Sequence, residues 1–455
     1  PGNALKAALI INIQVAVATR GHIKDLVSSA DVRNAQLVLL SAVYFKGTWL
    51  YGFKKHGRSM AGLTLMRKSL DGLNVTRLHS AWLAPLLLLA TLGGACVPTG
   101  LDMKLLKEVT SGPVDNHVIS PFLMSLLMSQ VWLGAEGTTR AEMTPVLGIS
   151  GPNDRSFLDG YRSALAVLSE NIDGVTTSVF SRIYRTRRYS VRRTFSDLLA
   201  NFYGSGVELL PSDARKAAQV INNQVSAATR GRIRGLETTA DLTSAALVLI
   251  SAVHFKGTWL YRFKKDGQKP FLTSDGDRRI DMMKVEARLG IAGQPNFDVV
   301  ELPYQNQDYS LLVLRPRFRT LFAVTMIRKS LDSLNVTWLH SQLHQTKVRV
   351  VMPSFKLERS YELPFYMKKL GIRQIFHQAA NFRGMSSDKI FVSKIIHKAV
   401  MEVNEEGTTA KATAVFSIAR ALPITVPFIV DRPFYVILYH KRERVTLFAG
   451  LVANP

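Results

Sequence analysis

From residue 101 onward, the spacing of apolar residues divides the chain into a helix-rich first part and a strand-rich second part. Apolar residues at helical spacing predict helices over 101–109, 151–171, 194–202, 217–233 and 361–370. Ser120 and Pro121 open one more helix, with a capping hydroxyl and a proline in the first turn. Apolar and alternating runs predict strands over 175–183, 246–255, 299–314, 348–352 and 434–451. Helices first and strands later, without regular alternation, predict an α+β fold in one domain.

The stretch 403–434 alternates like a strand but carries few large apolar residues. One side of its first half is small or apolar, with Thr408, Ala410, Ala412, Ala414, Phe416 and Ile418. The other side is mostly polar and includes Lys411. This is the pattern of a strand with one buried face. It predicts a strand that can be buried but need not be.

The first part of the chain repeats a later part. Residues 1–55 match 211–265 at a fixed offset, and 67–80 match 328–341. Two copies do not make a solenoid, which needs three or more stacked units. We therefore interpret 1–83 as a partial duplication that arose as an artefact of gene assembly or forms a non-native appendage. The alternative is a real appendage that adds an edge strand or swaps into a neighbour.

Residues 84–96 resemble a signal peptide. The apolar run is too short to span a bilayer and ends in small residues, as a cleavage region does. We expect a secreted, extracellular protein whose folded domain is 97–455. The alternatives are a buried apolar helix and a lipid anchor at Cys96, the only cysteine of the chain. One cysteine excludes an intrachain disulfide.

Composition and charge indicate the class of protein and the kinds of partner it could bind. Of the 455 residues, 47% are hydrophobic and 20% charged, which are globular values. The net charge of +24 favours polyanionic partners such as sulfated glycans. The densest basic cluster is a candidate heparin site, and the alternative is a solvated basic face; it comprises Arg182, Arg185, Arg187, Arg188, Arg192 and Arg193. We expect no nucleic-acid partner and no membrane partner.

The chain lacks the motifs of an enzyme. It has no nucleophile elbow with a Ser-His-Asp order and no phosphate-binding loop, and its lone cysteine and scattered histidines have no metal-ligand spacing. We expect no catalytic residue, no metal and no cofactor.

Five ordered motifs, lying between residues 116 and 439, carry a resemblance. They are NHVISPFLMSLLMSQVWLGAEGTT (116–139), INNQVSAATRGRI (221–233), LVLISAVHFKGTW (247–259), SKIIHKAVMEVNEEGT (393–408) and DRPFYVILY (431–439). Together they resemble serpins, in particular secreted inhibitory serpins of the arthropod and tick type, over about 101–455. The resemblance implies a monomer with a large central, mostly antiparallel sheet, helices, smaller sheets and an exposed reactive-centre loop.

The resemblance also implies a function. A serine protease would attack the loop, form an acyl-enzyme and be dragged away as the cut loop inserts as a strand. The hinge residues would be Glu405, Glu406, Gly407, Thr408, Ala410 and Ala412. Aligning the loop on 413–415 places the reactive bond at Arg420–Ala421, which suits a trypsin-like target, whereas counting from the hinge gives Ala421–Leu422. The alternatives are a non-inhibitory serpin and a heparin or polyanion carrier.

Four further positions are implied as those that control sheet opening. Ser120 and His397 would hold neighbouring strands through side-chain hydrogen bonds, and Trp259 would cover the end where the loop enters. Ser251 stands where the family has asparagine. We expect its shorter side chain to miss His397 and weaken the network. Without the resemblance, His397 and Trp259 would be ordinary core residues.

Asn335 begins the glycosylation sequon Asn-Val-Thr, and Asn74 begins a second one in the duplicated part. If the protein is secreted, Asn335 is a candidate for N-linked glycan and the protein a glycoprotein.

Overall fold

The structure is a computed structural model, and the described residues belong to one compact unit, Leu88–Pro455. It describes 97–455 apart from 170–173, 237–241, 243–244 and 406–424. The predictions for 1–83, including Asn74, and for 84–96 therefore lie outside the described residues.

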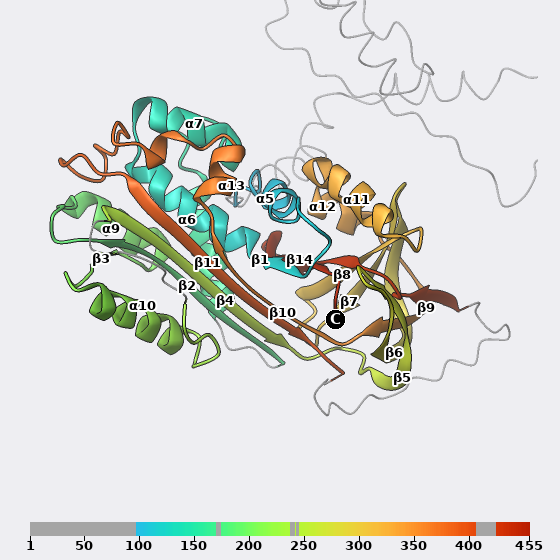
Figure 1. Ribbon diagram of the computed structural model, residues 1–455. Helices are drawn as coiled ribbons and strands as arrows, with labels where there is room; N and C mark the ends of the chain where they lie inside the picture. The colour runs from blue at the N-terminus through green and yellow to red at the C-terminus, as the bar shows by residue number, and fades with distance from the viewer. Residues whose placement is uncertain (1–96, 170–173, 237–241, 243–244, 406–424) are drawn as a thin grey trace, which may run out of the picture. The chain divides into compact units, whose positions relative to one another are not determined.

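Helices dominate the first part of the unit and recur between later strands (Figure 1). They are α5 (Asp102–Val109), α6 (Pro121–Gly134), α7 (Gly137–Leu147), α8 (Phe157–Ser169), α9 (Arg193–Tyr203), α10 (Ala214–Ala228), α11 (Leu321–Ser330), α12 (Val336–Ser341) and α13 (Pro364–Lys369), with short 3₁₀ turns η1 (Leu331–Ser333) and η2 (Gln374–Phe376). Capping side chains fix the first residues of several helices. The side chains of Ser120, Asp213 and Thr320 each accept a backbone N–H from the first turn of the helix that follows.

The strands of the described residues form two sheets. They are β1 (His117–Ile119), β2 (Val175–Arg185), β3 (Val207–Leu209), β4 (Leu247–Gly257), β5 (Lys264–Thr273), β6 (Gly276–Gly293), β7 (Phe297–Pro303), β8 (Tyr309–Pro316), β9 (His344–Pro353), β10 (Phe355–Glu362), β11 (Val392–Val403), β12 (Val426–Ile429), β13 (Phe434–His440) and β14 (Val445–Val452). One sheet has nine strands in the order β1-β14-β13-β8-β7-β6-β9-β12, with β5 paired to β6. The other has five, in the order β10-β11-β4-β2-β3.

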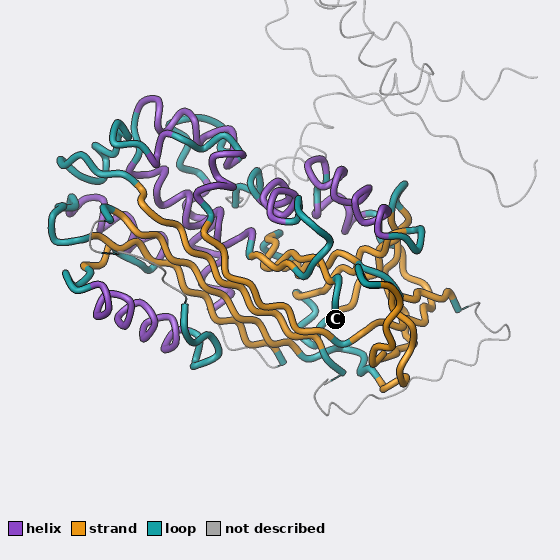
Figure 2. Tube along the Cα trace, in the orientation of Figure 1, coloured by secondary structure: helices purple, strands orange, loops and turns teal. Residues whose placement is uncertain are grey.

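The five-stranded sheet has a parallel pair at its centre. β11 runs parallel to β4, with His397 opposite Ser251, while each of these strands is antiparallel to its outer neighbour, β10 or β2. Both central strands therefore end at the same edge of the sheet. Figure 2 shows these long strands side by side.

Alternate residues of the five-stranded sheet face opposite sides and pack into two different hydrophobic cores. One face, with Phe180, Ile250 and Val400, packs against α10. The other, with Val253 and Ala399, joins the larger core that also includes residues of α6. Figure 1 shows α6 and α10 on opposite sides of the strands.

The predicted α+β class is confirmed, and most predicted elements lie where the spacing places them. The helix predicted over 361–370 begins only at Pro364, because residues up to Glu362 pair with β11. Among the described residues, no helix combines the length and the apolar character that crossing a bilayer requires.

Candidate functional site

A buried histidine links three elements at the centre of the five-stranded sheet. His397 lies on β11 and is fully buried. Its Nδ1 is 2.8 Å from the Oγ of Ser251 on β4, and its Nε2 accepts the backbone N–H of Ser120, before α6, at 2.9 Å. A nitrogen that accepts an N–H carries no proton, so the proton of the ring lies on Nδ1 and is donated to Ser251.

The hydrogen bonds fix both the charge and the orientation of this ring. Burial lowers the pKa of His397 to about 3, so the imidazole is neutral near pH 7. A proton on Nε2 would face the N–H of Ser120, which adds a repulsion between two donors. The hydroxyl of Ser251, having accepted from the ring, is free to donate to the Sδ of Met124 at 3.6 Å. The cluster His397–Ser251–Ser120 thus connects β11, β4 and α6.

Two expectations about this cluster are wrong. Ser251 is long enough to reach His397, because the parallel register places the two residues directly opposite each other. Ser120 contacts His397 through its backbone N–H, while its side chain accepts the N–H of Leu123 and caps α6.

A second contact lies at the edge of the sheet where β4 and β11 end. The indole Nε1 of Trp259 donates to the backbone oxygen of Asn404, directly after β11, at 2.8 Å. The indole stacks on Tyr304, with ring centroids 4.3 Å apart and an interplanar angle of 14°. A Cβ on Gly257 would lie 2.5 Å from the Tyr304 ring, so glycine is required for this approach. Trp259 is therefore held over the end of β11.

The chain leaves the five-stranded sheet at this edge and enters the other sheet. β11 ends at Val403, and β12 begins at Val426 and pairs in parallel with β9. Residues 404–425 therefore connect the end of a central strand of one sheet to the edge of the other.

Comparison with known proteins identifies this arrangement. The family model described as Serpin (serine protease inhibitor) matches residues 2–61 and 99–455. The chain belongs to the serpin family.

Individual serpins resemble it over most of their length. The chain is 31% identical to Iripin-2 of Ixodes ricinus over 77% of this chain and 90% of that protein. It is 33% identical to the leukocyte elastase inhibitor of Bos taurus over 75% of this chain and 94% of that protein. The structure of uncleaved ovalbumin matches the fold with a TM-score of 0.69 at 24% identity, over 80% of this chain and all of that one.

Most residues predicted for the hinge and reactive bond lie outside the described residues. These are Glu406, Gly407, Thr408, Ala410, Ala412, Arg420 and Ala421. Glu405 is described and half-buried beside the end of β11.

The arginines of the predicted heparin cluster fall into two groups. Arg187, Arg188, Arg192 and Arg193 are exposed around the connection from β2 to α9. Arg182 and Arg185 are half-buried on β2. Arg182 forms an ion pair with Glu208 at 3.1 Å, so its charge is already partly compensated.

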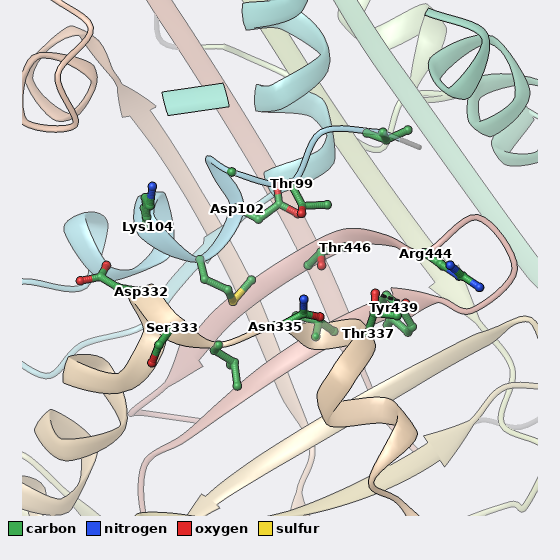
Figure 3. A pocket seen from close by; sticks show the side chains of 15 residues that line it. Thr99, Asp102, Lys104, Asp332, Ser333, Asn335, Thr337, Tyr439, Arg444 and Thr446 are labelled. Atoms are coloured by element: carbon green, nitrogen blue, oxygen red, sulfur yellow. Dashed lines mark hydrogen bonds between the residues drawn. The ribbon is translucent and has the colours of Figure 1, made fainter. Parts of the chain in front are cut away.

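Asn335 is exposed and caps α12 from the preceding position, where its Oδ1 accepts the N–H of Trp338 at 2.9 Å. It lies on the lining of a cavity of about 460 Å³ between α5, α12 and the β13–β14 hairpin (Figure 3). Another lining residue, Asp102, is buried and accepts the hydroxyl of Ser125. Burial raises the pKa of Asp102 to about 8. This cavity shares no lining residue with the His397–Ser251–Ser120 cluster.

Reasoning from the sequence missed two partners of these residues. The backbone oxygen of Asn404 accepts from Trp259, and Met124 is placed to accept from Ser251. Neither carries a motif, since a backbone oxygen is common to all residues and Met124 reads as an ordinary apolar residue of α6. Tyr304, which stacks on Trp259, was also missed, although it lies within the predicted strand stretch 299–314 and directly follows β7.

Proposed function

We propose that this serpin inhibits a trypsin-like serine protease as a suicide substrate. In this account the protease cuts the chain between β11 and β12, and the part attached to β11 enters the five-stranded sheet between β11 and β4. The parallel pairing of these two strands supports the proposal. A strand that follows β11 after a reverse turn runs antiparallel to both neighbours, so its insertion replaces one parallel pairing by two antiparallel ones.

The lengths of the segments also support insertion. β11 has 12 residues and β4 has 11. The alternating stretch 408–419 matches the length of β11, and 404–407 remain to form the turn. At roughly 3.3 Å per residue, a strand of this length carries a protease bound at its end about 40 Å across the sheet.

The composition of the alternating stretch fits a strand that must enter quickly. In its register the small residues Thr408, Ala410 and Ala412 share one face, while Lys411 lies on the other, so that no charge needs to be buried at the start. A separation of β11 from β4 also breaks the hydrogen bond between His397 and Ser251, so this bond opposes opening before cleavage.

We place the reactive bond at Arg420–Ala421. The protease serine attacks the carbonyl of Arg420, forms an ester with it and releases the amino group of Ala421. The acidic specificity pocket of a trypsin-like enzyme selects arginine. Between Lys411 and Arg432, Arg420 is the only basic residue.

The experiment incubates the full chain with trypsin, separates the products by denaturing electrophoresis and identifies the released peptide by mass spectrometry. We expect a covalent complex that survives denaturation and a peptide that starts at Ala421. Arg420→Ala should abolish the complex, whereas the matched control Lys411→Ala should retain it. Cleavage of the wild-type chain without any complex would favour a non-inhibitory serpin, and a complex retained by Arg420→Ala would refute the assigned bond.

An elastase-like protease is the second candidate target. A relative that is 33% identical is named leukocyte elastase inhibitor, and the alternative bond Ala421–Leu422 has the small residue that such enzymes prefer. Incubation with elastase distinguishes the two targets, because the released peptide would then start at Leu422.

We further propose that the protein is secreted and that Asn335 carries a glycan, since this asparagine is exposed at a sequon. Enzymatic removal of N-glycans from the protein secreted by eukaryotic cells should lower its mass, and Asn335→Gln should remove that shift. An unchanged mass of the wild-type protein would contradict the assignment.

The exposed part of the basic cluster supports a proposal of heparin binding. Replacing Arg187 and Arg188 by glutamine should lower the salt concentration that elutes the protein from heparin. The control replaces Arg278 and Arg279, two exposed arginines on β6, and removes the same charge elsewhere. Equal shifts for the two pairs would show that only net charge matters.

A further inference from the structure

A second cavity, of about 410 Å³, lies between α8, α9 and β2. Its size is within the range of small-molecule sites. Leu126, Leu165, Val179 and Phe202 contribute apolar surface to it. It shares no residue with the loop, with the His397–Ser251–Ser120 cluster or with the cavity beside Asn335.

The charged residues of this cavity have one sign. Arg162 and Arg182 line it, and none of its described lining residues is acidic. Arg162 is exposed on α8 and lies over the ring of Phe202, with 5.2 Å from its guanidinium carbon to the ring centroid. Arg182 lies on the face of β2 that also carries Phe180, with its guanidinium carbon 5.5 Å from the centroid of that ring, and donates to the backbone oxygen of Ser181 at 2.9 Å. Each arginine has one acidic partner outside the lining, Asp159 or Glu208, and retains further N–H donors.

An unpaired hydroxyl marks the sheet side of the cavity. Ser181 lines the cavity from β2 and is only 6% exposed. Its Oγ is buried and has no hydrogen-bond partner among the described residues. A buried polar atom without a partner is costly, so a group that accepts from this hydroxyl would be stabilised. The neighbouring hydroxyl of Tyr203, in contrast, is paired with Ser129 at 2.8 Å.

We propose that this cavity binds a small organic anion, a carboxylate on an apolar body. The carboxylate accepts from Ser181 and lies beside Arg162. The apolar body fills the space between α8, α9 and Val179. A chain of about ten carbons is a fitting probe, because its carboxylate matches the charge of the cavity and its tail matches the walls.

The test measures binding of decanoate to the full chain by titration calorimetry, with decyltrimethylammonium as the probe of opposite charge. We expect one decanoate per chain and at least tenfold weaker binding of the cation. Arg162→Gln should weaken decanoate binding roughly tenfold, and Ser181→Ala several-fold. Arg215→Gln, an exposed arginine on α10 outside the cavity, should leave it unchanged.

A blocking variant tests the location. Ala200 lines the cavity from α9 and is exposed, so Ala200→Phe adds bulk to the cavity without disturbing the core. Decanoate should raise the thermal midpoint of the wild-type protein, since it binds the folded state, and this rise should vanish in Ala200→Phe. Equal affinity for the two probes, no binding of decanoate, or undiminished binding by Ala200→Phe would each overturn the proposal. None of these measurements involves a protease, so the outcome is independent of the inhibitory function.

Discussion

The most informative single substitution is Ser251→Ala, because it removes one atom from the His397–Ser251–Ser120 cluster. The Nδ1–H of His397 then loses its acceptor, at 2.8 Å, in a fully buried site. The ring cannot avoid this by moving its proton, since Nε2 must remain free to accept from Ser120. An unsatisfied buried donor costs about 1–3 kcal/mol. We expect a loss of that size in the free energy of unfolding.

Ser181→Ala is a closely matched control. Ser181 lies directly opposite Ser251 across the β2–β4 pair and is also buried, but its hydroxyl has no partner among the described residues. Removing an unsatisfied hydroxyl should leave the stability unchanged or raise it slightly.

The assay is equilibrium unfolding of the full chain in urea, followed by tryptophan fluorescence, for the wild type and both variants. We expect a lower midpoint for Ser251→Ala alone. Unfolding of the two variants at the same urea concentration would show that the hydrogen bond between Ser251 and His397 contributes nothing.

Three other predictions concern separate parts of the molecule. Asp102→Asn should stabilise the protein by roughly 4 kcal/mol at pH 7, because a carboxyl with a folded pKa of about 8 and an unfolded value of 3.8 makes the wild-type protein lose stability as pH rises above 3.8; unfolding measured between pH 4 and 8 should show a flatter dependence for the variant, and parallel curves would contradict this. Asn116→Ala should cost about 2–4 kcal/mol, since the Asn116 side chain makes three hydrogen bonds of 2.6–2.9 Å to the backbone of Ala453 and Asn454; an unchanged urea midpoint would argue against this anchoring of the C-terminal end. Thr408→Arg should raise the number of inhibitor molecules consumed per protease molecule, because a charge on the inserting face slows entry; the control Lys411→Arg, on the other face, should not.

Many helices and strands were predictable because the local pattern of apolar and capping residues indicates them directly. The apolar run that became β4 and the Ser-Pro start of α6 both specify their elements without help from distant residues. The expectation that His397, Ser251 and Trp259 control sheet opening came from the family resemblance of their motifs rather than from periodicity.

The geometry of the site was not predictable in the same way. Whether Ser251 reaches His397 depends on the register of two parallel strands separated by more than a hundred residues. The contact between Asn116 and Asn454 joins positions 338 residues apart, and no local sequence pattern predicts it. The cavity beneath α8 and α9 arises from the packing of three elements, each of which appears ordinary by itself.

In the proposed mechanism, the chain after β11 becomes a strand between β11 and β4 once it is cut. The most direct test is to cleave the full chain once within 404–425, verify the single cut by mass spectrometry, and compare thermal unfolding of the cut and intact proteins. With roughly 1 kcal/mol for each of about a dozen new backbone hydrogen bonds, we expect the cut protein to unfold tens of degrees higher. A cut protein that unfolds at the same temperature as the intact one, or lower, would contradict this mechanism.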